Sequence, residues 1–336
     1  MLKTPFLTLT GIFILFIGTS CRSQEAAPVH PDVVRVSPLN DTVMRYLVQT
    51  NQIYDFGLDT LPQIRFWRRI MHMPPDSALV SLASNRLVFC SVAVADWEKL
   101  GDAGQTCFRD SCREVAGADS LASVLFTKGK NDFYDAAGVI PQIDKAIPIF
   151  VREGVDPFYA QAILLIESPG KMLRSKVGAM GPFQLMKGVA VKLGLKVNRH
   201  VDERKDFDKS AWAASKLIRT ICIPYTNSML DKRGICYDPN DLWYRLLVLH
   251  VYHAGAGNVE KAFQVMQPTE GGIGLITTLW QTSAGSFGKA SQAYSQLAIS
   301  ALIELDLVTG RTKSEETEIE LADRQNEAEK EVEKQN

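Results

Sequence analysis

The chain has no excess of charge of either sign, because 37 lysines and arginines stand against 38 aspartates and glutamates. It has no cluster of Lys and Arg interleaved with aromatic residues, so we predict no nucleic-acid partner. Histidine is rare. His250 and His253 lie three residues apart, but without a His-Glu-x-x-His pattern or a third ligand nearby they predict no metal site. No Gly-x-Ser-x-Gly elbow surrounds Ser168, which disfavours a serine nucleophile. The sequence predicts no cofactor.

A single glutamate, Glu167, closes the uncharged run Phe158–Ile166. An ionised carboxylate is costly to bury without partners, so such an acid is exposed, paired or kept protonated. Asp156 as N-cap, Pro157 at the first helical position and Ser168-Pro169-Gly170 after the glutamate predict a helix between them. Because almost every position of this helix is apolar, we expect burial to raise the pKa of Glu167, as a general acid requires.

Glu167 lacks a nearby carboxylate partner. Glycosidases usually use two carboxyl groups about 5 to 10 Å apart, but Asp156 lies eleven residues back, or roughly 16 Å along a helix axis. The next acid downstream is Asp202, in a distant segment. A site with one acid takes its nucleophile from elsewhere, most simply from the substrate. The competing interpretation is a glutamate that turns into solvent at a helix end.

Two later blocks accompany this glutamate. One runs from Ser175 to Met186 (Ser-Lys-Val-Gly-Ala-Met-Gly-Pro-Phe-Gln-Leu-Met) and one from Tyr252 to Val259 (Tyr-His-Ala-Gly-Ala-Gly-Asn-Val). Singly, each has a structural explanation, as a tight turn or as the packed end of a core helix. Together with Glu167-Ser168, and over about Gln142 to Leu307, they resemble the lytic transglycosylases of the soluble, goose-lysozyme-like type.

The resemblance implies a helical, lysozyme-like fold that cleaves the MurNAc-GlcNAc bond of peptidoglycan without water. In that family one glutamate protonates the glycosidic oxygen. It then acts as a base while the C6 hydroxyl of MurNAc attacks C1, which leaves a 1,6-anhydro end. By position Glu167 matches the catalytic acid, and the implied substrate-binding residues are Ser175, Gln184, Met186, Tyr252 and His253.

The chain departs from the family pattern at three places. Residues 168–174 lack the usual Phe-x-Pro segment, Phe183 stands where methionine is common, and His253 replaces the asparagine of the Tyr-Asn-Ala-Gly motif. The last change exchanges an amide for an imidazole next to the tyrosine that lies beside the acid. None of the three removes the acid itself.

Two other functions stay open at this stage. One is a hydrolytic muramidase on the same fold, in which water replaces the C6 hydroxyl, and the other is a non-catalytic peptidoglycan-binding scaffold. In each case the partner is the glycan strand. Asp144–Arg311 carries about 20 basic residues against about 15 acidic ones, a mild excess that suits an anionic wall.

The N-terminus has the pattern of a secretory signal peptide, with Lys3, the apolar run Gly11–Ile17 and small residues up to Ser20. It is too short to predict a retained membrane span. Cys21 follows the small residues as in a bacterial lipobox, although Gly18 replaces the usual leucine. Arg22 comes next, not the aspartate associated with inner-membrane retention. We expect lipidation at Cys21 and a location on the periplasmic face of the bacterial outer membrane, with the membrane contacted by the lipid anchor only.

The predicted fold is mainly α, with a lysozyme-like helical catalytic domain preceded by a helical N-terminal region. The predicted parts are a signal peptide (1–20), a tether (21–39), a helical N-terminal region of unknown role (40–140), a lytic transglycosylase domain (141–311) and a charged tail (312–336).

Five cysteines remain besides Cys21, so at least one stays unpaired. Cys222 and Cys236 flank a loop-like stretch and are the preferred disulfide in an oxidising compartment. Cys107 and Cys112 can pair with each other, or one of them with Cys90.

Overall fold

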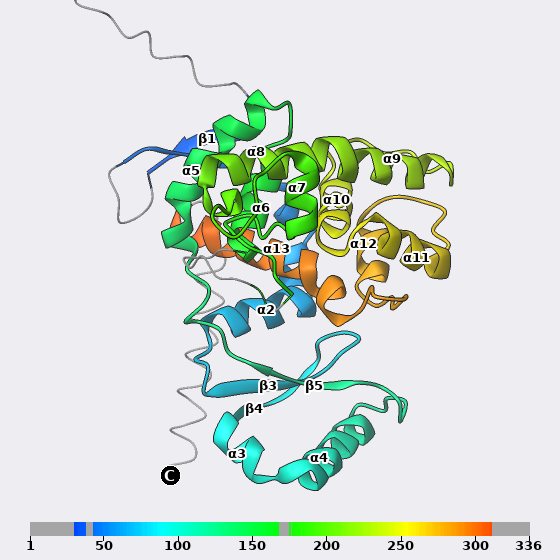
Figure 1. Cartoon of the computed structure of the whole chain (residues 1–336). Helices are drawn as coiled ribbons and strands as arrows, with labels where there is room; N and C mark the ends of the chain where they lie inside the picture. The colour runs from blue at the N-terminus through cyan, green and yellow to red at the C-terminus, as the bar shows by residue number, and fades with distance from the viewer. Residues whose placement is uncertain (1–29, 38–42, 168–174, 176, 311–336) are drawn as a thin grey trace, which may run out of the picture.

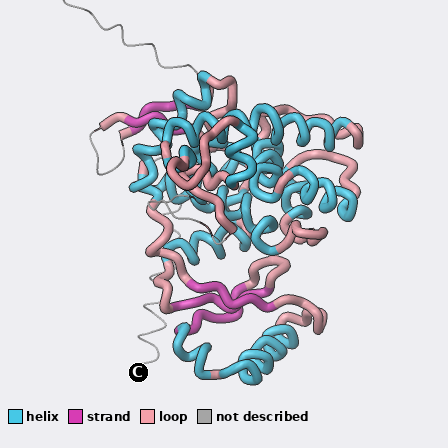
Figure 2. The backbone as a smooth tube through the Cα atoms, in the orientation of Figure 1, coloured by secondary structure: helices cyan, strands magenta, loops and turns pink. Residues whose placement is uncertain are grey.

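The computed structural model describes residues 30–37, 43–167, 175 and 177–310. Figure 1 shows a large helical body and, below it in this view, a small sheet covered by two helices. Figure 2 shows the strands concentrated in that lower part, with one further hairpin on the body. The predicted mainly α fold is confirmed. The N-terminal region also contains two small antiparallel sheets that the sequence analysis did not predict.

The elements follow one another in this order. The N-terminal half contains β1 (Val33–Val36), β2 (Arg45–Val48), α1 (Gln52–Asp55), η1 (Leu58–Thr60), α2 (Pro62–His72), β3 (Ser77–Leu82), β4 (Val88–Ala93), α3 (Val94–Lys99), α4 (Gly101–Val115), β5 (Val124–Lys128) and α5 (Ala136–Arg152). The remainder contains α6 (Phe158–Glu167), α7 (Lys187–Leu193), η2 (Glu203–Lys205), α8 (Phe207–Leu217), the π-helical turn η3 (Ile218–Cys222), α9 (Ile223–Asp231), α10 (Leu242–Ala254), α11 (Ala256–Met266), α12 (Ile273–Leu279) and α13 (Lys289–Val308).

Helix α6 forms the centre of the helical body and contacts α5, α10 and α13. The Asp156 carboxylate accepts a 2.8 Å hydrogen bond from the Phe158 amide at its start. Every residue from Phe158 to Ile166 is buried, and Glu167 is the last residue of the helix. The predicted helix and its burial are therefore confirmed.

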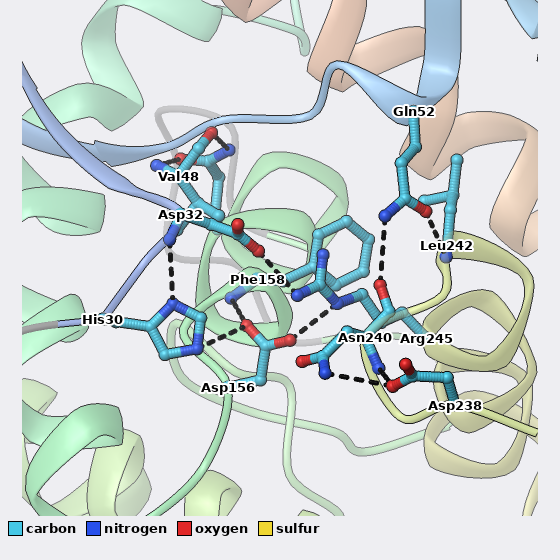
Figure 3. A network of polar contacts seen from close by, with 11 residues as sticks. His30, Asp32, Val48, Gln52, Asp156, Phe158, Asp238, Asn240, Leu242 and Arg245 are labelled. Atoms are coloured by element: carbon cyan, nitrogen blue, oxygen red, sulfur yellow. Dashed lines mark hydrogen bonds and ion pairs between the residues drawn. The ribbon is translucent and has the colours of Figure 1, made fainter. Parts of the chain in front are cut away.

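The β1–β2 hairpin packs on this body and is held there by polar contacts. The Val48 amide donates to Gln161 Oε1 of α6, and Gln161 Nε2 donates back to the Val48 carbonyl, both at 2.9 Å. Arg245 of α10, only 4% exposed, lies 2.7 Å from a carboxylate oxygen of Asp32 and 2.7 Å from one of Asp156 (Figure 3). Strand β1 thus packs on the helical body, although it falls within the segment predicted to be a tether.

The second sheet has the order β4-β3-β5, with every pair antiparallel. On one side of the central strand, Leu79 packs with Phe66 and Trp67 of α2. On the other side, Val80 packs with Trp97 and Cys112 of α3 and α4. Because both faces of β3 are covered, every residue from Ala78 to Leu82 is buried, Ser81 included, and the strand lacks the polar–apolar alternation that would have revealed it.

Helix α5 crosses the predicted boundary at residue 140, so the N-terminal region runs into the next part without a linker. Among the described residues, no helix has the length and hydropathy needed to cross a membrane.

The predicted disulfide between Cys222 and Cys236 is wrong in this structure, because both are free thiols, as are Cys90, Cys107 and Cys112. Cys222 is buried, which raises the pKa of its thiol to about 12, whereas Cys236 is exposed. Cys107 and Cys112 cannot pair with each other, since five residues of one helix place them about 140° apart around its axis.

Candidate active site

Glu167 is placed by the C-terminal end of α6, at the edge of the core that the helix fills. Burial raises the pKa of its carboxyl group from 4.5 to about 7, and the Tyr294 hydroxyl acts weakly in the opposite direction. No other acidic group of the described chain contributes to the shift. Near neutral pH this carboxyl group can both give and accept a proton.

Tyr294, on α13, is the residue that the sequence analysis missed at this site. Its side chain is 2% exposed, and burial followed by the Glu167 charge raises its pKa well above the ordinary value. The hydroxyl lies close enough to Glu167 to favour the ionised carboxylate, yet it forms no hydrogen bond of good geometry with any described group. A phenol in this position can stabilise the carboxylate after it has lost its proton.

Tyr252, near the end of α10, also lies near the acid. Burial, and then the Glu167 charge, raise the pKa of its phenol. The Tyr252 hydroxyl donates a 2.6 Å hydrogen bond to the Phe183 carbonyl, so the phenol joins α10 to the loop of residues 177–186. Tyr134, just before α5, is a third tyrosine near the acid, and it is partly buried. Desolvation and then the Glu167 charge raise its pKa.

His253 stacks on the ring of Tyr294, with 4.2 Å between ring centroids and 22° between planes. Desolvation lowers its pKa to about 4, so the imidazole is neutral at pH 7, although the residue as a whole is exposed. His253 therefore fixes Tyr294 by packing and adds no charge beside Glu167. The other histidine, His250, is fully buried with Nε2 2.8 Å from Ser295 Oγ.

Residues 180–185, ahead of α7, form a narrow hairpin. Met180 and Leu185 exchange backbone hydrogen bonds of 3.2 and 3.1 Å, with Gly181 and Gln184 in the turn between them. Gly181 has φ +83°, and a Cβ there would collide with the Arg204 carbonyl oxygen. Only glycine fits this position.

Arg204, in η2, supports the same hairpin and was also missed from the sequence. Its Nη1 donates to the carbonyls of Gly178 and Leu185, each at 3.0 Å, while Asp202 accepts from Nε and Nη2 at 2.9 and 2.7 Å. A buried guanidinium that is both paired and hydrogen-bonded rigidifies the loop it holds.

The structure places the remaining predicted residues on this loop. Ser175 Oγ accepts a 2.9 Å hydrogen bond from the Ala179 amide, so the serine closes a turn of its own backbone. Gln184 has φ +45°, and its side-chain amide donates 2.9 Å to the Gly181 carbonyl. Met186 is 43% exposed at the start of α7. Cys21 lies outside the described residues.

Tyr252 and Tyr294 thus both lie near Glu167, and His253 stacks on Tyr294. The hairpin that carries Gln184 is hydrogen-bonded to Tyr252. No three His, Cys, Asp or Glu side chains in the described ranges are grouped as a metal site would need.

Residues 149–271 match the family model of the Transglycosylase SLT domain. This range contains Glu167, the hairpin and the Tyr252-His253 pair, whereas Tyr134 and Tyr294 lie outside it. No curated protein matches the chain. Over residues 149–271 the chain therefore carries a segment similar to the Transglycosylase SLT domain, which supports a lytic transglycosylase.

Proposed function

We propose that the chain is a peptidoglycan lytic transglycosylase that cleaves the MurNAc-β-1,4-GlcNAc bond without water and leaves 1,6-anhydroMurNAc ends. The observation that carries this proposal is the state of Glu167. Its carboxyl group has a pKa of about 7 through burial, and no second carboxylate of the described chain acts on it. A lone acid that is half protonated at neutral pH suits a reaction whose nucleophile belongs to the substrate.

Glu167 first gives its proton to the glycosidic oxygen, and the bond from that oxygen to C1 breaks. The resulting carboxylate is stabilised by the nearby Tyr294 phenol. Glu167 then takes the proton of the MurNAc C6 hydroxyl as O6 bonds to C1. The carboxyl group returns to its starting state, and the two sugars together have neither gained nor lost water.

The hairpin and the end of α10 are the proposed substrate-binding elements. The Ser175 hydroxyl already accepts a backbone hydrogen bond, so its own proton remains to be donated to a sugar substituent. The exposed Met186 offers apolar surface for a sugar ring. Gln184 presents a side-chain amide from the turn, where its φ is positive. Tyr252 holds the hairpin beside the acid, and His253 holds the ring of Tyr294 there.

We also propose that the protein is exported and held at the periplasmic face of the outer membrane by a lipid on Cys21. The support is the signal-like N-terminal sequence with its cysteine after small residues. Labelling with a radioactive fatty acid tests this directly, because Cys21→Ser removes the label if the cysteine is the acylation site.

Digestion of purified sacculi tests the activity, with Glu167→Gln as the matched variant. The wild-type chain is expected to release muropeptides one water lighter than reducing-end products. Glu167→Gln is expected to bind sacculi and release almost nothing. Products with reducing ends alone would identify a muramidase, and sacculus binding without release by the wild-type chain would identify a scaffold. Equal release by both proteins would show that Glu167 is not the acid.

A further inference from the structure

Arg86 is a buried guanidinium without a counter-charge. It follows the β3–β4 turn with φ +60° and is 6% exposed. Among the described residues it forms no ion pair and no side-chain hydrogen bond, and Nε is enclosed without a partner. Burial alone accounts for the lowering of its pKa to about 10, so the group is still protonated at neutral pH.

Two aromatic rings of α2 hold this guanidinium in place. Its central carbon lies 4.9 Å from the ring centroid of Phe66 and 5.0 Å from that of Trp67. The Trp67 indole is itself fixed, because Nε1 donates a 2.9 Å hydrogen bond to Gln296 of α13. Cation–π contacts recover only part of what burying a charge costs, and they leave the N–H donors of the guanidinium unused.

A second unsatisfied polar group belongs to the same layer. The Ser81 hydroxyl on β3 is fully buried and has no hydrogen-bond partner in the described part of the chain. Ser81 lies two residues after Leu79 and opposite Val88, which both pack toward Phe66 and Trp67. Because side chains alternate along a strand, Ser81 is on the Arg86 side of the sheet.

This layer adjoins the candidate active site through α13. Ala293 packs with Phe66 and Trp67, while its neighbour Tyr294 lies beside Glu167. Figure 1 shows the sheet directly beneath α2, on the side of the body away from the hairpin β1–β2. A group bound at Arg86 therefore lies apart from the two sugars at Glu167, and α13 contacts both places.

We propose that Arg86 is a binding site for a carboxylate, namely one carried by the peptide stems of the glycan strand. A carboxylate matches the planar fork of a guanidinium and supplies the charge that the protein does not. This inference rests on the proposed function for its source of carboxylates, since peptide stems are attached to MurNAc and end in free acids.

Calorimetric titration of the full chain with a muramyl tetrapeptide tests the site, because this ligand has no glycosidic bond to cleave. The proteins are the wild type, Arg86→Met, Arg86→Lys and the control Arg65→Met, which removes an exposed arginine beside Phe66. We expect Arg86→Met to weaken binding at least tenfold, Arg86→Lys to weaken it less, and Arg65→Met to leave it unchanged. Amidating the ligand carboxylates is expected to weaken wild-type binding to the same extent and to have no effect on Arg86→Met.

The proposal is overturned if Arg86→Met binds as tightly as the wild type, or if the wild type does not bind at all. It is also overturned if amidation of the ligand weakens binding equally in both proteins. Thermal unfolding supplies a second readout. A purely structural arginine would lower the melting temperature when replaced, whereas an uncompensated charge should leave it equal or higher. If the wild type discriminates between the two ligands yet releases no anhydro ends from sacculi, the carboxylate site stands and the proposed activity fails.

Discussion

The hydroxyl of Tyr252 donates a 2.6 Å hydrogen bond to the carbonyl of Phe183. Phe183 is fully buried and stacks on Phe150 of α5 with ring centroids 5.7 Å apart. The end of α10, the hairpin and α5 are therefore fixed to one another beside the carboxyl group of Glu167. The site is built on packed helices rather than on a free loop.

Replacing Tyr252 with phenylalanine is expected to destabilise the protein by about 1–3 kcal/mol, because the buried Phe183 carbonyl loses its donor. Urea unfolding measures this change. Tyr225→Phe is the control, since that tyrosine is 53% exposed and should change stability by less than about 0.5 kcal/mol. Equal changes in stability from both substitutions would show that the Tyr252–Phe183 hydrogen bond contributes no more than an exposed hydroxyl.

Gly181→Ala is expected to destabilise the protein by more than about 1 kcal/mol, because φ is +83° and the new methyl group meets the Arg204 carbonyl. Gly188→Ala, in α7, meets nothing within 4 Å and should stabilise by up to about 1 kcal/mol. Thermal unfolding of the two variants measures both changes in stability. A tolerated Gly181→Ala would mean that the hairpin is not held as described.

The raised pKa of Glu167 makes stability depend on pH. From pH 4.5 to about 7 the folded carboxyl group binds more protons than the unfolded one, so its contribution to stability falls as pH rises and is constant above that range. Glu167→Gln cannot ionise. At pH 8 its free energy of unfolding should exceed that of the wild type by up to about 3 kcal/mol. At pH 4 the loss of the ionisable group should add little to the difference. Denaturant titrations at both values measure the difference, and a gain independent of pH would contradict the raised pKa.

Arg245→Met is expected to destabilise the protein by about 3–5 kcal/mol, because it removes the buried arginine that pairs with both Asp156, at the start of α6, and Asp32 (Figure 3). The control is Arg219→Met, whose half-exposed guanidinium lies 3.6 Å from Glu153 and should contribute less than about 1 kcal/mol. Chemical denaturation compares the two variants. Similar small losses from both would show that the N-terminal hairpin is not secured through Arg245.

Part of this structure is predictable from local sequence. Asp156, the apolar run and the Pro-Gly stop define α6, and Glu167 at its end follows from them. The position of Tyr294 could not be predicted, because it lies on a helix that is buried on nearly all sides. The sequence of such a helix does not distinguish a functional tyrosine from one that only packs in the core. No local sequence pattern predicts Arg204 or Arg86, because their roles depend on contacts with carbonyls and rings that the fold brings together.

The strands of the N-terminal region could not be predicted for a related reason. β3 is a short, largely apolar segment, and periodicity cannot separate such a strand from a short buried helix. The disulfide prediction failed because Pro224 and Asn227, which looked loop-like, belong to α9. Cys222 ends the preceding turn η3 and is buried, whereas Cys236 lies beyond α9 and is exposed.

In the proposed reaction Glu167 directs attack by the substrate's own C6 hydroxyl rather than by water. Digestion of sacculi in water enriched in heavy oxygen, followed by mass spectrometry of the released ends, distinguishes the two nucleophiles. We expect 1,6-anhydro ends that carry no heavy oxygen and that disappear with Glu167→Gln. Reducing ends labelled with one heavy oxygen atom would contradict the proposed reaction.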